Sequence, residues 1–350
     1  MLNWNGIEFT KKSINSLLSI NYPNYEILVL DNGSQNKEAD EIDRIFKGKI
    51  KLVRNKKNVG YARGMNILYK HTKEKYIMFL NNDMKFDKNF LLPLVEVLVN
   101  DKSVGACQPK VKDLKNKKYF EYAAAAGGYI DIFGYPFARG RIFSDVERDK
   151  GQYDQEVIVA WGGVTLVRRK ALEKNFIYDP IFFNYSEDVD LCYRMYGKGY
   201  KVVFNHNSIV YHYGGGVLGK DLGKKMFFIH RNHLILILKD WELRTLAWLI
   251  WPRIFLDIVS FFYYLFTGFP QSAAAIIKAY LSLFLILPQI YKSRVNTQKK
   301  INRKHFSQMP IYKGSIVLDY FLFKKRTFAD ILKNNPSFKN SIFNNLWIKI

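Results

Sequence analysis

Short apolar runs that end abruptly in polar residues recur along the first part of the chain. Residues 76–80 are mostly apolar and lack helical spacing, and Asn81, Asn82 and Asp83 follow at once. Residues 25–30 are a similar run that ends in Asp31 and Asn32. Such runs are typical of strands that are buried on both faces, as in a parallel sheet covered by helices.

Helix-like segments separate these runs. Residues 8–20 carry apolar side chains on one face, residues 38–46 read as a second helix, and residues 58–70 begin with glycines and continue as a third. Gly60 and Gly64 of the third would let the backbone approach a ligand closely. With a further strand at residues 50–54, the order is β-α-β-α-β-α-β. This order predicts an α/β fold with a mostly parallel sheet flanked by helices.

Polar side chains follow three of these strands. They are Asn3 and Asn5, then Asp31 and Asn32, then residues 81–83. Ligands of open α/β sheets bind beyond the carboxyl ends of strands. A carboxylate such as Asp83 suits Mg²⁺ or Mn²⁺, which keeps waters and takes further oxygens from a substrate phosphate. The alternative is that residues 81–83 form only a polar turn.

The middle of the chain contains a second concentration of acidic residues. Glu187, Asp188 and Asp190 follow Ser186, which predicts an N-cap and a helix that runs to Lys198. One acidic residue in a first turn is an ordinary partner of the helix dipole. Three exceed that need, so one carboxylate is a candidate general base; Asp190 is expected to be structural.

Three further segments carry candidate residues. Residues 112–155 are a polar and aromatic excursion of the kind that shapes an acceptor cleft, without assignable residues. Residues 157–167 predict a strand that contains Trp161, Gly162 and Gly163, and Trp161 could equally be a core aromatic. His212 precedes three glycines, which suggests a ligand on a mobile loop or, alternatively, a histidine satisfied in the core.

Composition and charge narrow the partners. The 350 residues carry a net charge of +23, which predicts attraction to nucleic acid, an anionic membrane or phosphorylated substrates. Hydrophobic residues make up 48% of the chain, enough for a sizeable core. The two cysteines have no ligand-like spacing, and no dinucleotide-binding or P-loop glycine motif is present.

The C-terminal third is more apolar than the rest. Residues 243–266 and 273–291 are each near the ~20 residues that span a bilayer, and basic residues flank the pair. Arg253 and Asp257 argue against insertion, because buried charges are costly in lipid. A spanning hairpin, two interfacial helices and a soluble helical subdomain all remain possible on this pattern. Residues 305–350 have no assigned role.

The four polar segments together resemble the family 2 glycosyltransferases, in particular their rhamnosyltransferase-like branch. The resemblance rests on Asn3-Trp4-Asn5-Gly6, on 31–34, on Asn58-x-Gly60-Tyr61-Ala62-x-Gly64-x-Asn66, and on Leu80-Asn81-Asn82-Asp83. Two departures stand out. The metal-binding D-x-D pattern begins with Asn81, and only Met1 and Leu2 stand where the family has a longer first strand.

The resemblance implies a GT-A fold and a set of site residues. It assigns the general base to Asp188, with Glu187 beside it, and the metal to Asp83 and His212. It assigns the sugar and acceptor to Trp161, Gly162 and Gly163. The implied nucleotide-binding residues are Asn3, Asn5, Asp31, Asn58, Gly60, Arg63, Asn66 and Asn82.

The expected function is an inverting, metal-dependent transfer of a single sugar. The donor would be a UDP- or dTDP-sugar, for example of rhamnose, and the acceptor a lipid-linked saccharide or another cell-surface glycan. The expected division is a catalytic domain over 1–218, membrane-associated helices over 219–304 and a tail over 305–350. The protein is expected at the cytoplasmic face of the membrane, either as a peripheral protein or inserted as a short hairpin. The processive-synthase Arg-Trp motif is absent. The alternatives are a nucleic-acid-binding protein, which the clustering of basic residues around apolar helices disfavours, and an inactive membrane scaffold.

Overall fold

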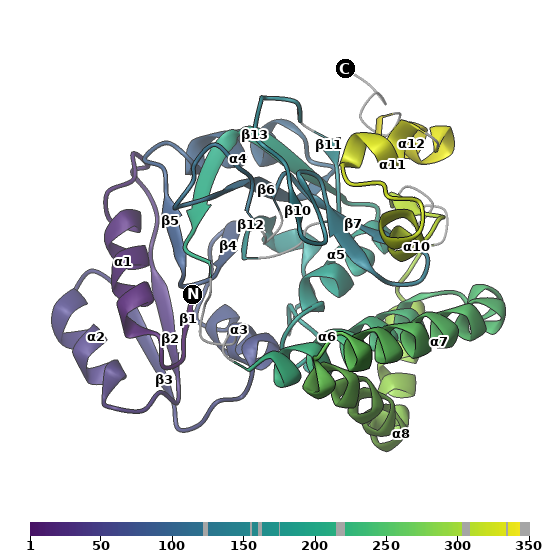
Figure 1. Cartoon of the computed structure of the whole chain (residues 1–350). Helices are drawn as coiled ribbons and strands as arrows, with labels where there is room; N and C mark the ends of the chain where they lie inside the picture. Colours follow the sequence, from purple (N-terminus) through teal and green to yellow (C-terminus); the bar gives the residue numbers. More distant parts are fainter. Residues whose placement is uncertain are drawn as a thin grey trace.

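A parallel three-stranded ladder forms the N-terminal part of the molecule (Figure 1). The computed structural model describes residues 1–121, 125–154, 156–159, 163–174, 176–214, 221–302, 309–333 and 335–343. The ladder consists of β1 (Leu2–Asn3), β2 (Leu28–Asn32) and β3 (Lys51–Asn55). Its helices are α1 (Ile7–Leu17), α2 (Glu38–Phe46) and α3 (Tyr61–Tyr69). Asn3 pairs with Asp31, so the polar tips of β1 and β2 meet at one edge as expected.

A larger sheet forms the centre of the molecule. Its strands run in the order β11 (Glu156–Val157), β13 (Lys201–His212), β6 (Val104–Asp113), β12 (Val164–Arg168) and β4 (Tyr76–Leu80), and β5 (Met84–Phe86) pairs with β13. β12 is antiparallel to both of its neighbours, whereas β6 and β13 are parallel. The α/β class is confirmed, but the sheet is mixed rather than mostly parallel. An apolar run shows that a strand is buried, and does not show the direction of its partners.

Two helices hold this sheet. α4 (Leu91–Asn100) buries Leu91, Leu94 and Leu98 against it. α5 (Glu187–Gly197) is buried along almost its whole length and follows the short helix η1 (Arg169–Ala171) in the chain. The expected helix after Ser186 is therefore confirmed, with its end one residue earlier than Lys198.

The C-terminal residues complete a third sheet. Its order is β10 (Asp145–Val146), β9 (Arg141–Ile142), β8 (Pro136–Ala138), β7 (Gly128–Asp131) and β14 (Ile311–Tyr312). The helices α10 (Ile316–Phe321), α11 (Phe328–Lys333) and α12 (Pro336–Phe343) follow β14. Phe328 stacks on Tyr129 at 5.2 Å between ring centroids, and Asp131 accepts a hydrogen bond from the Ile316 amide. The described part of 305–350 is thus built into the fold rather than being a separate tail.

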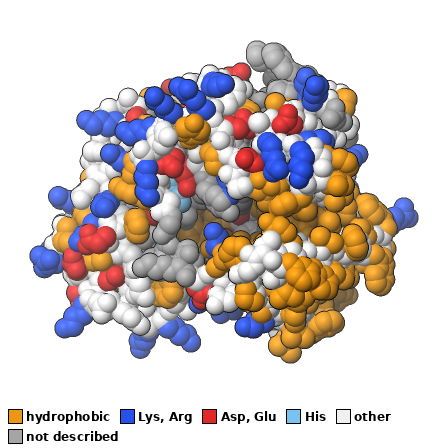
Figure 2. Space-filling model, viewed as in Figure 1, with side chains coloured by type: hydrophobic (Ala, Val, Ile, Leu, Met, Phe, Trp, Pro, Cys, Tyr) orange, Lys and Arg blue, Asp and Glu red, His pale blue; other side chains and the backbone are white. Residues whose placement is uncertain are grey.

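Three long helices lie beside one another below these sheets (Figure 1). They are α6 (Leu222–Asp240), α7 (Leu243–Phe266) and α8 (Pro270–Gln298). α7 has the bounds expected for the first apolar segment. By length and composition, α7 and α8 could each cross a membrane, with mean hydropathies of 1.5 and 1.8. Figure 2 shows hydrophobic side chains gathered over these helices, with Lys and Arg spread over the N-terminal half.

The two charged residues in the middle of α7 face the protein, whereas Arg244 in its first turn is exposed. Arg253 and Asp257 are 0% and 1% exposed and pair with each other at 3.1 Å. Asp257 also accepts hydrogen bonds from Tyr135 of the β7–β8 turn and from Tyr280 of α8. The two charges that argued against insertion therefore anchor α7 to the third sheet, and the opposite face of α7 is the exposed, apolar one.

Candidate active site

One large cavity brings together most of the polar residues expected at the site. Its volume is about 1290 Å³, and it lies between the strand tips, the start of α5 and the helices α6, α7 and α10. The sequence-predicted residues that line it are Asn58, Gly60, Asn82, Asp83, Gly163, Glu187, Asp188 and His212. Asp83 and Asp188, which are 105 positions apart in the chain, thus face one cavity.

Asp83 sits in a row of three titratable groups. His212 lies with Nε2 3.1 Å from Asp83 Oδ2 and with Nδ1 3.0 Å from Glu121 Oε2. Burial opposes protonation of His212, but the hydrogen bonds and charges of the two carboxylates outweigh it and raise its pKa to about 10. A cationic imidazolium therefore stands between two acids. His212 is the last residue of β13 and not part of a loop, so the strand holds it in place.

One oxygen of Asp83 is left over in this arrangement. Oδ1 is buried, and no described group donates a hydrogen bond to it. Buried polar atoms without partners are uncommon in folded proteins, so this atom calls for a ligand. This oxygen is the feature that fits a divalent cation, although the described residues contain no preformed cluster of three metal-binding side chains. His212 Nε2 could join it as a ligand only after giving up its proton, because a metal ligand must be deprotonated.

The start of α5 has an unusual backbone. Tyr185 and Ser186 have φ angles of 70° and 67°, in the left-handed region that costs of order 1–3 kcal/mol for each such residue. Asn232 of α6 donates to the carbonyls of Asn184 and Tyr185 at 2.6 and 2.8 Å and holds the turn. Ser186 is the N-cap residue by position, but its side chain makes no capping hydrogen bond. The strained turn directs the first turn of α5 toward the cavity.

The two acids at this helix start have different surroundings. Burial, reinforced by the charge of Asp188, raises the pKa of Glu187 well above its ordinary value. Glu187 Oε2 is buried without a described partner. Asp188 is half-buried and accepts a hydrogen bond from the Val189 amide at 2.8 Å. Asp188 is thus the less buried acid of the pair, and its role as the general base stays a prediction. Asp190 is fully buried and paired with Arg194, which confirms its structural role.

A tyrosine connects the two acidic centres. Tyr61, the first residue of α3, is half-buried, and its pKa is raised by desolvation and by the charges of Glu187, Asp188 and Asp83. All three carboxylates are therefore near one phenol. Gly60, just before it, has a φ angle of 83°, and a Cβ there would lie 2.5 Å from the Phe183 carbonyl oxygen. The glycine lets the start of α3 pack against the segment before α5.

The structure corrects the reading of two residues in the glycine-bearing segment. Gly64 was expected to let the backbone approach a ligand, but a Cβ there would lie 2.4 Å from a methyl group of Leu2. Asn66 was expected to bind the nucleotide. Its amide instead donates to the Tyr178 carbonyl and accepts from the amides of Ile177 and Tyr178. Gly64 thus allows close packing against β1, and Asn66 holds the segment of Ile177 and Tyr178. The sequence pattern could not reveal these contacts, because it does not show which distant segment lies against a helix.

Other predicted nucleotide-binding residues lie behind or beside the cavity. Asn3 is 0% exposed, and its amide donates to Asp31 at 3.1 Å and accepts from Thr10 at 2.7 Å. Asn3 therefore positions Asp31, which is 4% exposed. Asn3 itself does not face the cavity. Asn5 accepts a hydrogen bond from the Gln35 amide. Arg63 lines a neighbouring cavity. A nucleotide role for Asp31, Asn5 and Arg63 stays a prediction.

The sugar and acceptor segment is only partly visible. Trp161 and Gly162 lie outside the described residues. Gly163 has a φ angle of 40°, and its carbonyl accepts a hydrogen bond from the Asn81 amide at 2.7 Å. A Cβ on Gly163 would lie 2.2 Å from the Met84 methyl group. The glycine therefore allows β12 to approach the residues that lead to Asp83.

Sequence reasoning missed the opposite wall of the cavity. The third sheet and its β7–β8 turn supply Tyr135, Phe137 and Arg141, and α7 and α10 supply Phe255, Tyr263 and Phe321. Glu121, the second acid beside His212, was missed as well. These residues lie in the excursion or in the C-terminal helices, whose position relative to the strand tips no local pattern reveals.

Comparisons with known proteins agree with this geometry. The model of the family "Glycosyl transferase family 2" matches residues 1–176. An inactive polypeptide N-acetylgalactosaminyltransferase-like protein 5 of Mus musculus is 30% identical over 177 residues, which is 48% of this chain and 38% of that protein. An N-acetylglucosaminyl-diphospho-decaprenol L-rhamnosyltransferase of Mycobacterium tuberculosis is 22% identical over 242 residues, 63% of this chain and 78% of that protein.

A solved structure shares the fold. The crystal structure of GalNAc-T7 with UDP, GalNAc and Mn²⁺ superposes with a TM-score of 0.54 at 19% identity, over 69% of this chain and 47% of that one. The matches to the mouse protein and to GalNAc-T7 thus span less than half of those relatives. The GT-A fold expected from the sequence is confirmed, and the family match covers just over half of the chain. The chain belongs to glycosyl transferase family 2.

Proposed function

We propose that this protein is an inverting glycosyltransferase that moves one sugar from a nucleotide-diphosphate donor, UDP- or dTDP-linked, to a lipid-linked saccharide. The observation that carries the proposal is the shared cavity of Asp83 and Asp188. One carboxylate has a buried oxygen without a described partner, which suits a cation, and the other lies half-buried on the cavity wall, where an acceptor hydroxyl could reach it. Inverting transfer needs these two functions on one reacting centre.

Asp83 and His212 are the residues that would hold Mg²⁺ or Mn²⁺. The fit rests on Asp83 Oδ1, which is buried and without a described partner. A divalent cation supplies neutralisation of the leaving diphosphate when it is bound. GalNAc-T7, which shares the fold, has been solved with UDP and Mn²⁺, and this supports the choice of cation. Asn82 and Asn58, on the same cavity wall, are oriented by Thr10 and by Asn32 and are positioned to bind the donor.

Asp188 is the proposed general base. It takes the proton of the acceptor hydroxyl as that oxygen attacks the anomeric carbon. Because Glu187 beside it is neutral, Glu187 carries no negative charge that would repel the diphosphate. The strained turn at Tyr185 and Ser186, held by Asn232, fixes the direction in which Asp188 points.

The acceptor is proposed to be amphiphilic because the cavity joins polar and apolar walls. Side chains of α7 and α10 line the cavity and are also exposed at the molecular surface: Phe255 is 64%, Tyr263 50% and Phe321 43% exposed. A lipid chain would lie on this wall while its saccharide reached Asp188. The Mycobacterium tuberculosis relative is named for a diphospho-decaprenol acceptor, which agrees with this proposal.

The helices α7 and α8 are proposed to lie in the membrane interface rather than across the bilayer. α8 runs along α6, since Arg294 donates to the Leu238 carbonyl at 2.8 Å and Gln271 lies against Gly223 near the other end of α6. α6 carries the fully buried Lys239 and Asp240. If α8 spanned the bilayer, α6 would enter the lipid beside it with these two charges, which is costly. An apolar face with basic flanks is typical of interfacial helices.

The test is turnover of UDP- and dTDP-sugars with a polyprenyl-diphosphate saccharide, with Mn²⁺ present. Asp83→Ala and Asp188→Asn should each lower kcat/KM by about 10²-fold or more, because general base catalysis contributes about 10²–10⁴-fold. Glu96→Gln, an exposed position on α4, is the matched control and should leave turnover unchanged. Circular dichroism verifies that each variant is folded.

Two results would contradict the proposal. Full activity of Asp188→Asn would remove the base assignment. The unmodified protein could also show no turnover across the donor panel while it still binds vesicles. That result would favour an inactive scaffold; the mouse relative is itself named as inactive.

A further inference from the structure

A second cavity, of about 1000 Å³, lies where the start of α3 meets α6 and α8. Lys57, Asn58 and Arg63 line it from the α3 side, Arg231 from α6, and Lys292 from α8. Asn58 and Phe183 border both this cavity and the one that holds Asp83. The second cavity is therefore a neighbour of the candidate active site with a wall of its own.

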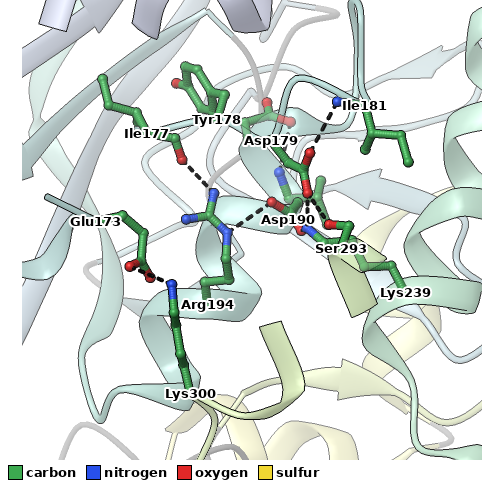
Figure 3. A network of polar contacts seen from close by, with 12 residues as sticks. Glu173, Ile177, Tyr178, Asp179, Ile181, Asp190, Arg194, Lys239, Ser293 and Lys300 are labelled. Atoms are coloured by element: carbon green, nitrogen blue, oxygen red, sulfur yellow. Dashed lines mark hydrogen bonds and ion pairs between the residues drawn. The ribbon is translucent and has the colours of Figure 1, made fainter. Parts of the chain in front are cut away.

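The wall of this cavity is strongly basic. Seven of its lining side chains are Lys or Arg and two are carboxylates, so its formal charge is 7 − 2 = +5. Both carboxylates are already engaged (Figure 3). Glu173 pairs with Lys198 at 2.9 Å and with Lys300 at 3.1 Å, while Asp179 pairs with the buried Lys239 at 3.0 Å. The remaining positive charge thus has no acid of the wall to neutralise it.

Three of the cations have no acid beside them. In the part of the chain that the structure describes, no carboxylate lies within ion-pair distance of Lys57, Arg63 or Lys292. All three are exposed to solvent, and they line the same cavity from two distant segments of the chain. Converging unpaired cations are the arrangement that binds phosphate groups.

Arg231 is the most informative of the lining residues. Its guanidinium donates to Asn232 at 2.9 Å and to the Ile181 carbonyl at 3.3 Å, and it lies over the ring of Phe228 at 5.0 Å. None of these neighbours is a carboxylate. Burial lowers the pKa of Arg231 to about 10, as for a cation that has left water without gaining a counter-ion. An anion in the cavity would supply it.

The cavity adjoins the apolar face of α8. Lys292 follows Tyr291, which is 69% exposed, and Leu285 one turn and a half earlier is 80% exposed. The cavity is lined by Ile286, Gln289 and Ser293 on the adjacent stripe of the same helix. When the apolar face of α8 rests in the acyl region of a bilayer, Lys292 stands at the depth of the lipid phosphates.

We propose that this cavity binds the phosphate group of an anionic membrane lipid, with Arg231 and Lys292 as its principal cations. The lipid would fix the orientation of α8 on the membrane next to the active-site cavity. The proposal concerns binding alone, so it does not depend on the transfer reaction or on the identity of the donor.

The first measurement is sedimentation with vesicles of phosphatidylcholine that contain roughly 20% phosphatidic acid, compared with vesicles of pure phosphatidylcholine. One Lys or Arg near an anionic surface contributes about 1 kcal/mol, so Arg231→Gln and Lys292→Gln should each weaken binding about fivefold. Lys299→Gln is the matched control. It removes the same charge at the C-terminal end of α8, and Lys299 does not line the cavity. The control should weaken binding less than twofold.

The second measurement separates the sources of phosphate. Thermal unfolding is recorded with soluble dihexanoyl phosphatidic acid, with inorganic phosphate and with UDP. Stabilisation by the short-chain lipid that is lost in Lys292→Gln supports the proposal. Equal stabilisation by inorganic phosphate, competition by UDP, or an equal effect of Lys299→Gln would each overturn it, assigning the cavity to free phosphate, to the donor or to no specific ligand.

Discussion

At the scale of single residues, the two acids at the start of α5 differ in how deeply they are buried. Both line the cavity, but Glu187 is 6% exposed, and burial raises its pKa well above its ordinary value, whereas Asp188 is half-buried. The sequence motif was sufficient to identify the pair. It did not show which member is more desolvated, since that depends on how distant segments of the chain pack around α5.

Glu187→Gln should therefore be mild. The amide has the shape and neutrality of the protonated carboxyl, so we expect kcat/KM within about threefold of the unmodified protein, far from the ~10²-fold loss at Asp188. The pH dependence of kcat/KM should also keep its acidic limb in Glu187→Gln. A loss of that limb, or of activity, would transfer the base assignment to Glu187.

A second prediction at this scale separates backbone strain from steric contact. Gly48 and Gly60 have φ angles of 76° and 83°, but only Gly60 has neighbours that a Cβ would meet. Gly48→Ala should lower the free energy of unfolding by about 1–2 kcal/mol, and Gly60→Ala by about 3 kcal/mol or more. Urea unfolding gives both values. Equal losses would mean that the contact with Phe183 relaxes without strain.

At the scale of elements, helices were predicted well and sheet partners were not. The bounds of α7 and the start of α5 follow from local apolar spacing and from the acids after Ser186. The antiparallel insertion of β12 between β4 and β6 depends on pairings far apart in the chain. For the same reason, Glu121 beside His212 carried no signal in the sequence.

Buried ion pairs connect α5 to α6, which packs beside α8. Lys239 of α6 is 0% exposed and contacts Asp190 of α5 and Asp179. Lys239→Met would leave both acids without this partner, so the free energy of unfolding should fall by about 3–5 kcal/mol. The exposed Lys299→Met should change it by less than about 0.5 kcal/mol. A small effect of Lys239→Met would show that Arg194 and Ser293 suffice to balance the acids.

The join between β7 and α10 gives a pH-dependent prediction. Burial raises the pKa of Asp131 to about 7, against hydrogen bonds from the amides of Tyr135 and Ile316. Between the unfolded pKa, near 4, and pH 7, the folded state binds more protons, so stability falls as pH rises and levels off above pH 7. The free energy of unfolding of the unmodified protein, minus that of Asp131→Asn, should therefore fall from about pH 5 to pH 7. A difference that is constant with pH would contradict the assignment.

At the scale of the whole molecule, one surface combines three functions. The exposed apolar faces of α7, α8 and α10 adjoin the mouth of the active-site cavity and the basic cavity beside α8. The charges of α7 are used inward, through Arg253 and Asp257. The chain thus has an exposed apolar side next to both cavities, and this is the side that we propose to lie on lipid.

This arrangement predicts the topology of the α7–α8 turn. Cys107 and Cys192 are buried, so a cysteine introduced at the exposed Thr267 is the one expected to react. In protein bound to the outside of sealed vesicles, Thr267→Cys should be labelled by a membrane-impermeant maleimide, because interfacial helices keep the turn on the protein side. Protection that persists until the vesicles are lysed would mean that the hairpin crosses the bilayer.

The pairing of β14 with β7 also sets the order in which the protein can mature. Ile316 meets Asp131 across 185 positions, and α10 supplies part of the cavity wall. A nascent chain therefore leaves that strand edge and its aromatic neighbours uncovered until residues 311–316 have emerged from the ribosome. The cavity is closed only once α10 has joined it, so a shorter nascent chain has no competent pocket.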